Sequence, residues 1–243
     1  MSFLNKIKLS VNINKLATIR NARGGNNPNI LDFAKKIESY GADGITVHPR
    51  PDQRHIRFQD VYDLKNNIST EFNIEGYPSD DFIKLVLEVG PHQVTLVPDK
   101  PDAITSNSGW DTKAHQGYLK HIVQQFKSAN IRTSLFLNPD PSFIESAAAT
   151  GADRIELYTE SYASNFFIDK EKAIQPYIET AIKAHEFNLG LNAGHDLDLD
   201  NLKYFAQNVP HLLEVSIGHA LICDALTYGM SNVVKMYLNQ LRD

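Results

Sequence analysis

The feature that most constrains this chain is the alternation of short β-rich runs with longer stretches of helical periodicity, repeated from residue 7 to the C-terminus. Most of the β-rich runs are enriched in Val, Ile, Leu and Phe, which is typical of strands buried on both faces. The pattern predicts eight strands, at residues 7–13, 43–48, 72–75, 93–97, 132–137, 154–158, 189–193 and 212–217.

Helical stretches separate the predicted strands, at residues 29–40, 79–89, 114–129, 141–150 and 172–187. Gly41 and Gly151 end two of these stretches, because glycine readily takes the left-handed conformation that stops a helix. Strict β-then-α alternation predicts a parallel sheet. Eight such units favour an α/β fold of the (β/α)8 TIM-barrel type, and an open doubly wound sheet remains the alternative.

Length and charge narrow the class of protein. A TIM barrel typically needs about 250 residues, so residues 1–243 are expected to form a single catalytic domain. A formal net charge of −5 without a Lys/Arg run argues against binding to nucleic acid or to an anionic membrane. The single cysteine, Cys223, and an N-terminus without the apolar core of a signal peptide favour a cytoplasmic protein.

Titratable side chains gather at the C-terminal ends of the predicted strands, where TIM-barrel enzymes place their chemistry. His48, His195 and His219 end or follow the second, seventh and eighth strands, and His55 lies in the loop after the second. One such histidine is more often structural than catalytic, but three at strand ends, accompanied by carboxylates, favour an active site.

The carboxylates are Glu75, at the end of the third predicted strand, and Glu156, inside the sixth. We expect both to point into the barrel mouth, because an unpaired charge between strands and helices would be costly. Burial and like-charge neighbours there would raise a carboxylate pKa and suit it to proton transfer. The alternative for each is a structural ion pair with Arg or Lys.

Two regions have the composition of anion sites. Lys15 and Arg23 follow the first strand, and Arg50 and Arg54 follow the second, in segments expected to be loops that can direct cationic groups at a ligand. After the eighth strand, Gly218 precedes a short extra helix, an arrangement that often binds phosphate through backbone N–H groups. The pair of sites predicts two phosphorylated substrates, or one bisphosphate.

Two connections on the same face are longer than the rest, at residues 98–113 and 158–170. Both follow a strand and precede a helix, so we expect loops over the mouth. The first is rich in Pro, Asp, Ser and Asn and carries Trp110, and it is expected to close over a bound phosphosugar as a lid.

Several motifs, taken in order, resemble one family along the chain from the first strand to the eighth. They are Val11-Asn12-Ile13, Arg20-Asn21-Ala22-Arg23-Gly24, Gly41-Ala42-Asp43-Gly44-Ile45-Thr46-Val47-His48, Arg54-His55-Ile56, Leu96-Val97-Pro98, Asn192-Ala193-Gly194-His195 and Ile217-Gly218-His219-Ala220. Their joint order resembles the pyridoxine 5′-phosphate synthase family, although no single motif is decisive.

The resemblance implies a TIM-barrel enzyme of vitamin B6 biosynthesis that needs no cofactor and assembles as a homo-octamer. It implies that 3-amino-2-oxopropyl phosphate condenses with 1-deoxy-D-xylulose 5-phosphate to give pyridoxine 5′-phosphate, phosphate and water. It further implies that His48 and Glu75 are proton acceptors, His195 a proton donor and Glu156 a transition-state stabiliser. The implied contacts to the aminoketone phosphate are Asn12, Arg23, Gly218 and His219, and those to the deoxyxylulose phosphate are Arg50, His55 and Thr105.

Three positions depart from the family pattern: Asn14-Lys15 stands where Asp-His is frequent, and Asp196 where glycine is frequent. Asn14 and Lys15 are still expected to bind substrate, because an added ammonium favours a phosphate. A carboxylate beside a phosphate would repel it, so Asp196 is expected to contribute only its backbone N–H.

Two other functions stay open on the sequence alone. One is a phosphosugar isomerase or lyase on the same barrel, and the other is a non-catalytic barrel that binds a phosphorylated metabolite. A metal-dependent version is disfavoured, because no His-x-His ends a strand and Arg50 stands where a second ligand would be needed. We therefore expect no metal site.

Overall fold

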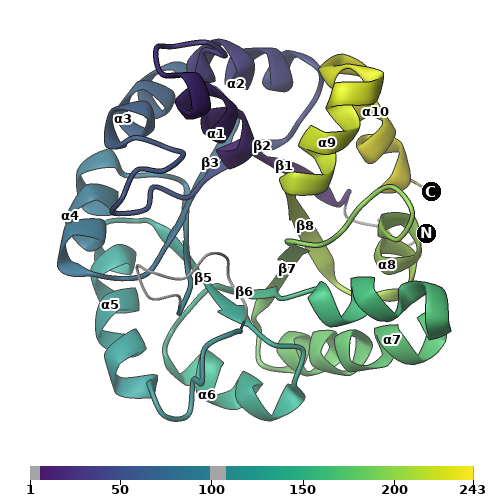
Figure 1. Ribbon diagram of the computed structural model, residues 1–243. Coiled ribbons are helices and arrows are strands. Elements are labelled where there is room, and N and C mark those ends of the chain that lie inside the picture. Colours follow the sequence, from purple (N-terminus) through teal and green to yellow (C-terminus); the bar gives the residue numbers. More distant parts are fainter. Residues whose placement is uncertain (1–5, 99–107, 243) are drawn as a thin grey trace.

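A computed structural model describes residues 6–98 and 108–242. Its eight strands form one closed parallel barrel in sequence order, with β1 paired to β8 as well as to β2. Figure 1 shows this ring of strands with the helices around its outside. The strands are β1 (Lys8–Asn12), β2 (Gly44–Val47), β3 (Glu71–Gly76), β4 (Gln93–Leu96), β5 (Arg132–Leu137), β6 (Arg154–Leu157), β7 (Gly190–Gly194) and β8 (Leu212–Ile217).

The fold confirms the predicted TIM barrel and all eight predicted strands, each boundary within one residue. The extra helix after the last strand is also confirmed. The helices are α1 (Asn14–Arg23), α2 (Ile30–Ser39), α3 (Phe58–Asn67), α4 (Asp80–Val89), α5 (Gln116–Ser128), α6 (Ile144–Ala149) after the 3-10 turn Pro141–Phe143, α7 (Glu160–Glu186), α8 (Leu202–Asn208), α9 (His219–Tyr228) and α10 (Met230–Gln240).

Two of the expected loops are helical. Residues 158–170 were expected to be a loop, but α7 begins at Glu160 and only Asp169, with non-helical φ/ψ, interrupts it. The first part is helical because Tyr162 is fully buried and packs edge-on against Tyr177 and Phe205. The segment containing Arg23 was also expected to be a loop, and it is the last turn of α1.

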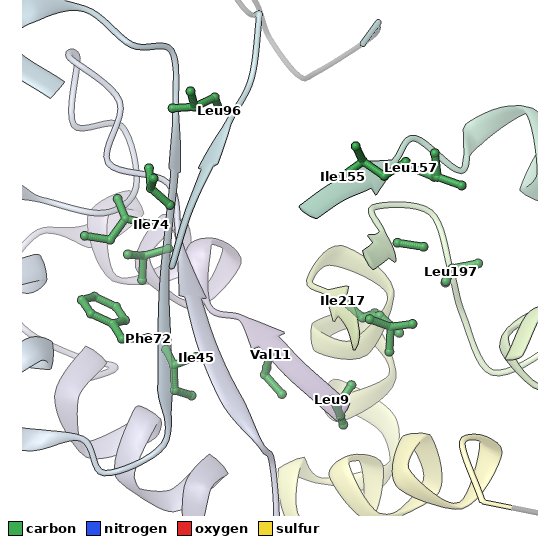
Figure 2. Close-up of a cluster of buried hydrophobic side chains, with 14 of the residues drawn as sticks. Leu9, Val11, Ile45, Phe72, Ile74, Leu96, Ile155, Leu157, Leu197 and Ile217 are labelled. Carbon is green, nitrogen blue, oxygen red and sulfur yellow. The ribbon is translucent and has the colours of Figure 1, made fainter. Parts of the chain in front are cut away.

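Apolar strand residues form the core between the barrel and the helices. Figure 2 shows such residues from several strands, among them Leu9, Ile45, Phe72 and Ile217, all of which are fully buried in one core cluster. Successive residues of a strand point to opposite faces, so the alternate positions face the barrel interior.

The barrel interior is polar. The Ser10 and Thr46 hydroxyls lie 2.7 Å apart, and the Thr95 hydroxyl on β4 donates to Asn73 on β3. The same hydroxyl lies 3.5 Å from a carboxyl oxygen of Glu156 on β6, which is not a neighbour of β4 in the sheet. A contact between non-adjacent strands has to cross the interior. The predicted direction of Glu156, into the barrel, is therefore confirmed.

Within the described ranges, every helix is too short or too polar to cross a bilayer.

Candidate active site in the barrel mouth

A cavity of about 770 Å³ opens at the C-terminal ends of the strands. This volume lies within the range that is typical of small-molecule sites. It brings together residues from β1, β3, β4, β5, β6 and β8, from the turns that follow the strands, and from the first turns of α1, α7 and α9. Its lining includes the predicted site residues Asn12, Asn14, Lys15, His48, Arg50, His55, Glu75, Glu156, His195, Asp196, Gly218 and His219.

Two predicted residues are not part of this group. Arg23 is exposed in the last turn of α1 and does not line the cavity among the described residues. Thr105 lies outside the described residues. Trp110, which was expected on the lid, is only 5% exposed, and its ring N–H donates to the Leu96 carbonyl. That end of segment 98–113 is therefore packed into the core.

Asparagines from the start of the chain hold two of the candidate catalytic groups. The Asn12 side-chain NH2 donates to the Glu75 carboxylate over 3.2 Å, and the Asn12 side-chain oxygen accepts the Asn14 backbone N–H. The Asn14 side-chain oxygen in turn accepts the backbone N–H of His48 over 2.9 Å. This chain of contacts places the end of β1 beside the ends of β2 and β3. Asn14, expected as a substrate contact, positions the backbone of His48.

The loop after β2 carries the cationic side of the cavity and is fastened to α1. Arg20 is buried and pairs with both oxygens of Asp60, and it also donates to the His55 carbonyl. The Asn21 amide donates to the same carbonyl over 2.7 Å. Two neighbouring side chains of α1 therefore hold the backbone at His55, which lines the cavity together with Arg50 and Arg54. Sequence reasoning missed this anchoring role of Arg20, since nothing in its motif separates a structural arginine from a ligand-binding one.

Both histidines of this region are held neutral. Burial, followed by the charges of Arg50 and the neighbouring His55 and Arg54, lowers the pKa of His48 to about 3. Burial and the charges of Arg54 and Arg50 lower the pKa of His55 to about 4. The His55 Nδ1 atom accepts the Ile56 N–H, so the proton of the neutral ring is on Nε2. His48 can therefore accept a proton, and His55 can donate a hydrogen bond to an anion.

The opposite side of the mouth is acidic. Glu156 is 3% exposed, and burial, then the charges of Glu75 and Glu214, raise its pKa well above the ordinary value. A carboxyl group of this kind can hold a proton near neutral pH. His195 lies next to it, with its ring edge-on to Tyr158 at 5.5 Å between centroids. One side of the cavity thus carries a carboxyl group that favours its protonated form, Glu156, and the other side carries imidazole rings that favour their unprotonated form, His48 and His55.

The turn from β8 into α9 forms the third side. Gly218 precedes α9, and His219 and Ala220 are its first two residues, so the unpaired N–H groups of this helix end lie at the cavity. A helix N-terminus attracts anions through these N–H groups and its dipole. The two anion-binding regions expected from the sequence therefore border the same cavity.

Several cavity residues were not singled out from the sequence: Thr18, Thr95, Val97, Phe136, Ala163, Asp198, Ser216 and Ala220. Positions at strand ends, such as Val97, could have been selected by their place in the barrel. For cavity residues inside a strand, such as Thr95 and Phe136, the sequence carries no signal that separates them from other strand residues. Across the described residues, no group of three or more His, Cys, Asp or Glu side chains could hold a metal ion.

Comparison with known proteins gives a family match over most of the chain. Residues 9–243 match the family described as "Pyridoxal phosphate biosynthesis protein PdxJ". The chain is 60% identical over 235 residues to the pyridoxine 5′-phosphate synthase of Cytophaga hutchinsonii, covering 97% of this chain and 99% of that protein. It is 62% identical over 229 residues to the protein of the same name from Parabacteroides distasonis, covering 94% and 96%.

Solved structures with low sequence identity share the fold. Phosphoribosylanthranilate isomerase from Thermotoga maritima aligns with a TM-score of 0.60 at 12% identity, covering 97% of this chain and 98% of that one. Thiamine phosphate pyrophosphorylase from Pyrococcus furiosus aligns with a TM-score of 0.61 at 10% identity, covering 98% and 96%. Both support the barrel architecture alone.

Proposed function

The chain belongs to the pyridoxine 5′-phosphate synthase family, and on that premise we propose that its barrel mouth condenses 3-amino-2-oxopropyl phosphate with 1-deoxy-D-xylulose 5-phosphate. The products are pyridoxine 5′-phosphate, inorganic phosphate and water. One observation carries the proposal: a single cavity joins two anion-binding regions to acidic and basic groups in opposite protonation states.

The reaction needs several proton transfers, because imine formation, dehydration, phosphate loss and ring closure move protons on different atoms. In the proposed mechanism, neutral His48 and the Glu75 carboxylate accept protons, and His195 donates one. Glu156 stabilises the transition state. The low pKa of His48 supports its role as an acceptor, and the Asn12 contact supports Glu75 by fixing its carboxylate.

Each end of the cavity receives one phosphate in this proposal. The N–H groups at Gly218 and His219 bind the aminoketone phosphate, next to Asn12. Arg50, His55 and Lys15 bind the deoxyxylulose phosphate on the cationic side. The assignments of Asn12 and Thr105 to phosphate binding come from the resemblance alone, and Arg23, which the sequence also favoured, does not line the cavity among the described residues.

A turnover assay with both substrates tests the function directly, by phosphate release and product fluorescence. His195→Asn keeps a hydrogen-bonding group but removes the titratable proton, so turnover should fall about 10²–10⁴-fold with little change in substrate affinity. An unchanged rate would assign His195 a structural role.

Activity should persist after exhaustive chelation of metal ions. A loss of activity that a divalent ion restores would contradict the acid/base scheme.

We also propose a cytoplasmic location, from the single cysteine and the N-terminus without the apolar core of a signal peptide, and a homo-octamer, from the resemblance. Light scattering of the purified protein checks the assembly.

A further inference from the structure

Asp196 gives the cavity a carboxylate where a phosphate-binding turn would be expected to avoid one. Its side chain is directed at His195: Oδ2 of Asp196 lies 2.8 Å from Nδ1 of His195. The two side chains are 30% and 34% exposed, and both line the cavity. The carboxylate charge is therefore engaged by the neighbouring ring.

The backbone on both sides of this pair is held by a buried hydroxyl. Thr159 donates to the Gly194 carbonyl over 2.7 Å and accepts the Asp196 N–H over 3.1 Å. Thr159 is fully buried, and the buried Asn201 donates to the Asp196 carbonyl. The N–H that was expected to bind substrate is thus used within the protein, and the side chain of Asp196 is placed by the turn.

His195 itself has an unusual backbone conformation, with φ at 24°. This is the left-handed region, which a residue with a side chain adopts only when its surroundings determine it. The contacts of Thr159 provide that constraint, since they bracket His195 from Gly194 to Asp196. The ring is therefore held from its backbone and from Nδ1.

We propose that Asp196 is a positioning residue for His195. This inference rests on the proposed function, in which His195 donates a proton. An ionised carboxylate only accepts hydrogen bonds, so Nδ1 must carry a proton and Nε2 is the position that exchanges a proton with substrate. The negative charge also stabilises the protonated ring. After donation from Nε2, the neutral ring keeps its remaining proton on Nδ1, bonded to Asp196.

Other titratable groups lie around His195 and bear on any pH effect. They are Glu156 on β6, Tyr158 after β6, Asp198 in the same turn and His219 on α9. A substitution at Asp196 leaves all of them in the protein. Comparison of variants that differ only at Asp196 thus isolates its contribution.

The test measures protonation of His195 separately from catalysis. Diethyl pyrocarbonate reacts with neutral imidazole, so peptide mass spectrometry of the modified enzyme against pH gives the titration midpoint of His195. In Asp196→Asn the midpoint should fall by about 0.5–1 pH unit, because the stabilising charge is lost. Asp196→Glu, which keeps the charge, should stay near the wild-type midpoint.

Asp200→Asn is the matched control, since Asp200 is exposed in the same loop. Equal midpoints in wild type and Asp196→Asn would overturn the proposal.

Turnover supplies the second readout. In Asp196→Asn, kcat should fall about 10-fold while KM stays within about twofold, and the alkaline limb of the kcat–pH profile should move to lower pH with the midpoint. A shifted midpoint with unchanged kcat would show a pair that does not serve catalysis, which contradicts the proposal. Failure of the wild-type enzyme to turn over the two substrates would refute the proposed function instead, and the modification experiment would still test the pair.

Discussion

At Glu156 and His48, the same cavity shifts two pKa values in opposite directions. Burial acts on both residues, and it disfavours the charged form of each. For Glu156 the neighbouring carboxylates of Glu75 and Glu214 add to the effect, and for His48 the neighbouring Arg50 and Arg54 do. The acid is therefore held protonated and the base held neutral, which is the arrangement that a sequence of proton transfers requires.

Glu156→Gln should be more stable than the wild type at alkaline pH. The pKa of Glu156 is raised above the ordinary value of 4.5, so the folded state binds this proton more tightly than the unfolded state. Its contribution to stability is complete below 4.5 and is lost as pH rises through the folded-state pKa. Urea unfolding should show an advantage for the variant at about pH 8 that shrinks towards about pH 4.5.

Turnover of Glu156→Gln should fall about 10²–10³-fold if Glu156 stabilises the transition state. Glu179→Gln, an exposed site on α7, is the matched control and should change neither property. A variant that loses stability at every pH would contradict the raised pKa.

His48→Asn should lose turnover by about 10²–10⁴-fold and should resist acid better than the wild type. The pKa of His48 is lowered from 6.5 to about 3, so the stability it contributes is complete above 6.5 and is lost as pH falls towards 3. Acid titration followed by circular dichroism measures the effect. A wild-type and a variant curve that coincide below pH 6.5 would show that His48 is not held neutral.

At the scale of the elements, the turns that leave the strands place the reactive groups. Gly194 ends β7 where any Cβ would collide with the Ser216 backbone of β8, so only glycine lets the two strands meet before His195. Gly218 follows β8 and lies against Asn12, with the site of its missing Cβ 3.1 Å from the Asn12 Cβ. These close approaches join the seventh and eighth units to the first.

Gly218→Ala should therefore reduce activity through Asn12. Gly218 has a φ of −124°, outside the left-handed region, and an added Cβ would press on the Asn12 side chain. Displacement of Asn12 would loosen Glu75, and kcat/KM should fall about tenfold, equivalent to about 1.4 kcal/mol. Gly117→Ala on α5, with open space at its Cβ, should instead raise the free energy of unfolding by about 0.5–1 kcal/mol without changing kcat/KM. Steady-state kinetics and urea unfolding distinguish the two.

At the scale of the whole molecule, the barrel interior has two charged layers with different roles. The mouth carries the acid, the histidines and the cationic loop. The opposite end is closed by ion pairs between non-adjacent strands: Lys8 with Glu71 at 2.9 Å, and Arg154 with Glu214 at 3.3 Å. Arg132 also pairs with Glu71. In TIM barrels, this N-terminal end serves stability and the mouth serves chemistry.

Arg154→Met should destabilise the protein without affecting substrate binding. The side chains of Arg154 and Glu214 are 13% and 4% exposed, so removal of the arginine leaves a buried carboxylate without its partner. The free energy of unfolding should fall by about 3–5 kcal/mol. KM for both substrates should stay at the wild-type value in the folded enzyme.

The double variant Arg154→Met/Glu214→Leu should recover much of that loss, because it removes both charges together. A double variant as unstable as the single one would indicate that packing, and not the unpaired charge, sets the cost. Urea unfolding of the three proteins measures the comparison.

The sequence by itself determined the strands, the barrel and most of the cavity. Residues such as His48, Glu75 and Gly218 were predicted from local signals, because a TIM barrel places the end of every strand at one mouth. Eight β/α units in order therefore define which residues meet, without knowledge of their contacts.

Only the tertiary structure decided which groups pair within that mouth. The helical start of α7 depends on Tyr162 packing against Phe205, and the orientation of His195 depends on Thr159, which is 36 residues away along the chain. Asp196, expected to offer only its N–H, uses that N–H for Thr159 and its carboxylate for His195. These contacts join residues far apart in sequence or set a side-chain direction, and no local pattern encodes either, because both depend on how the closed barrel packs.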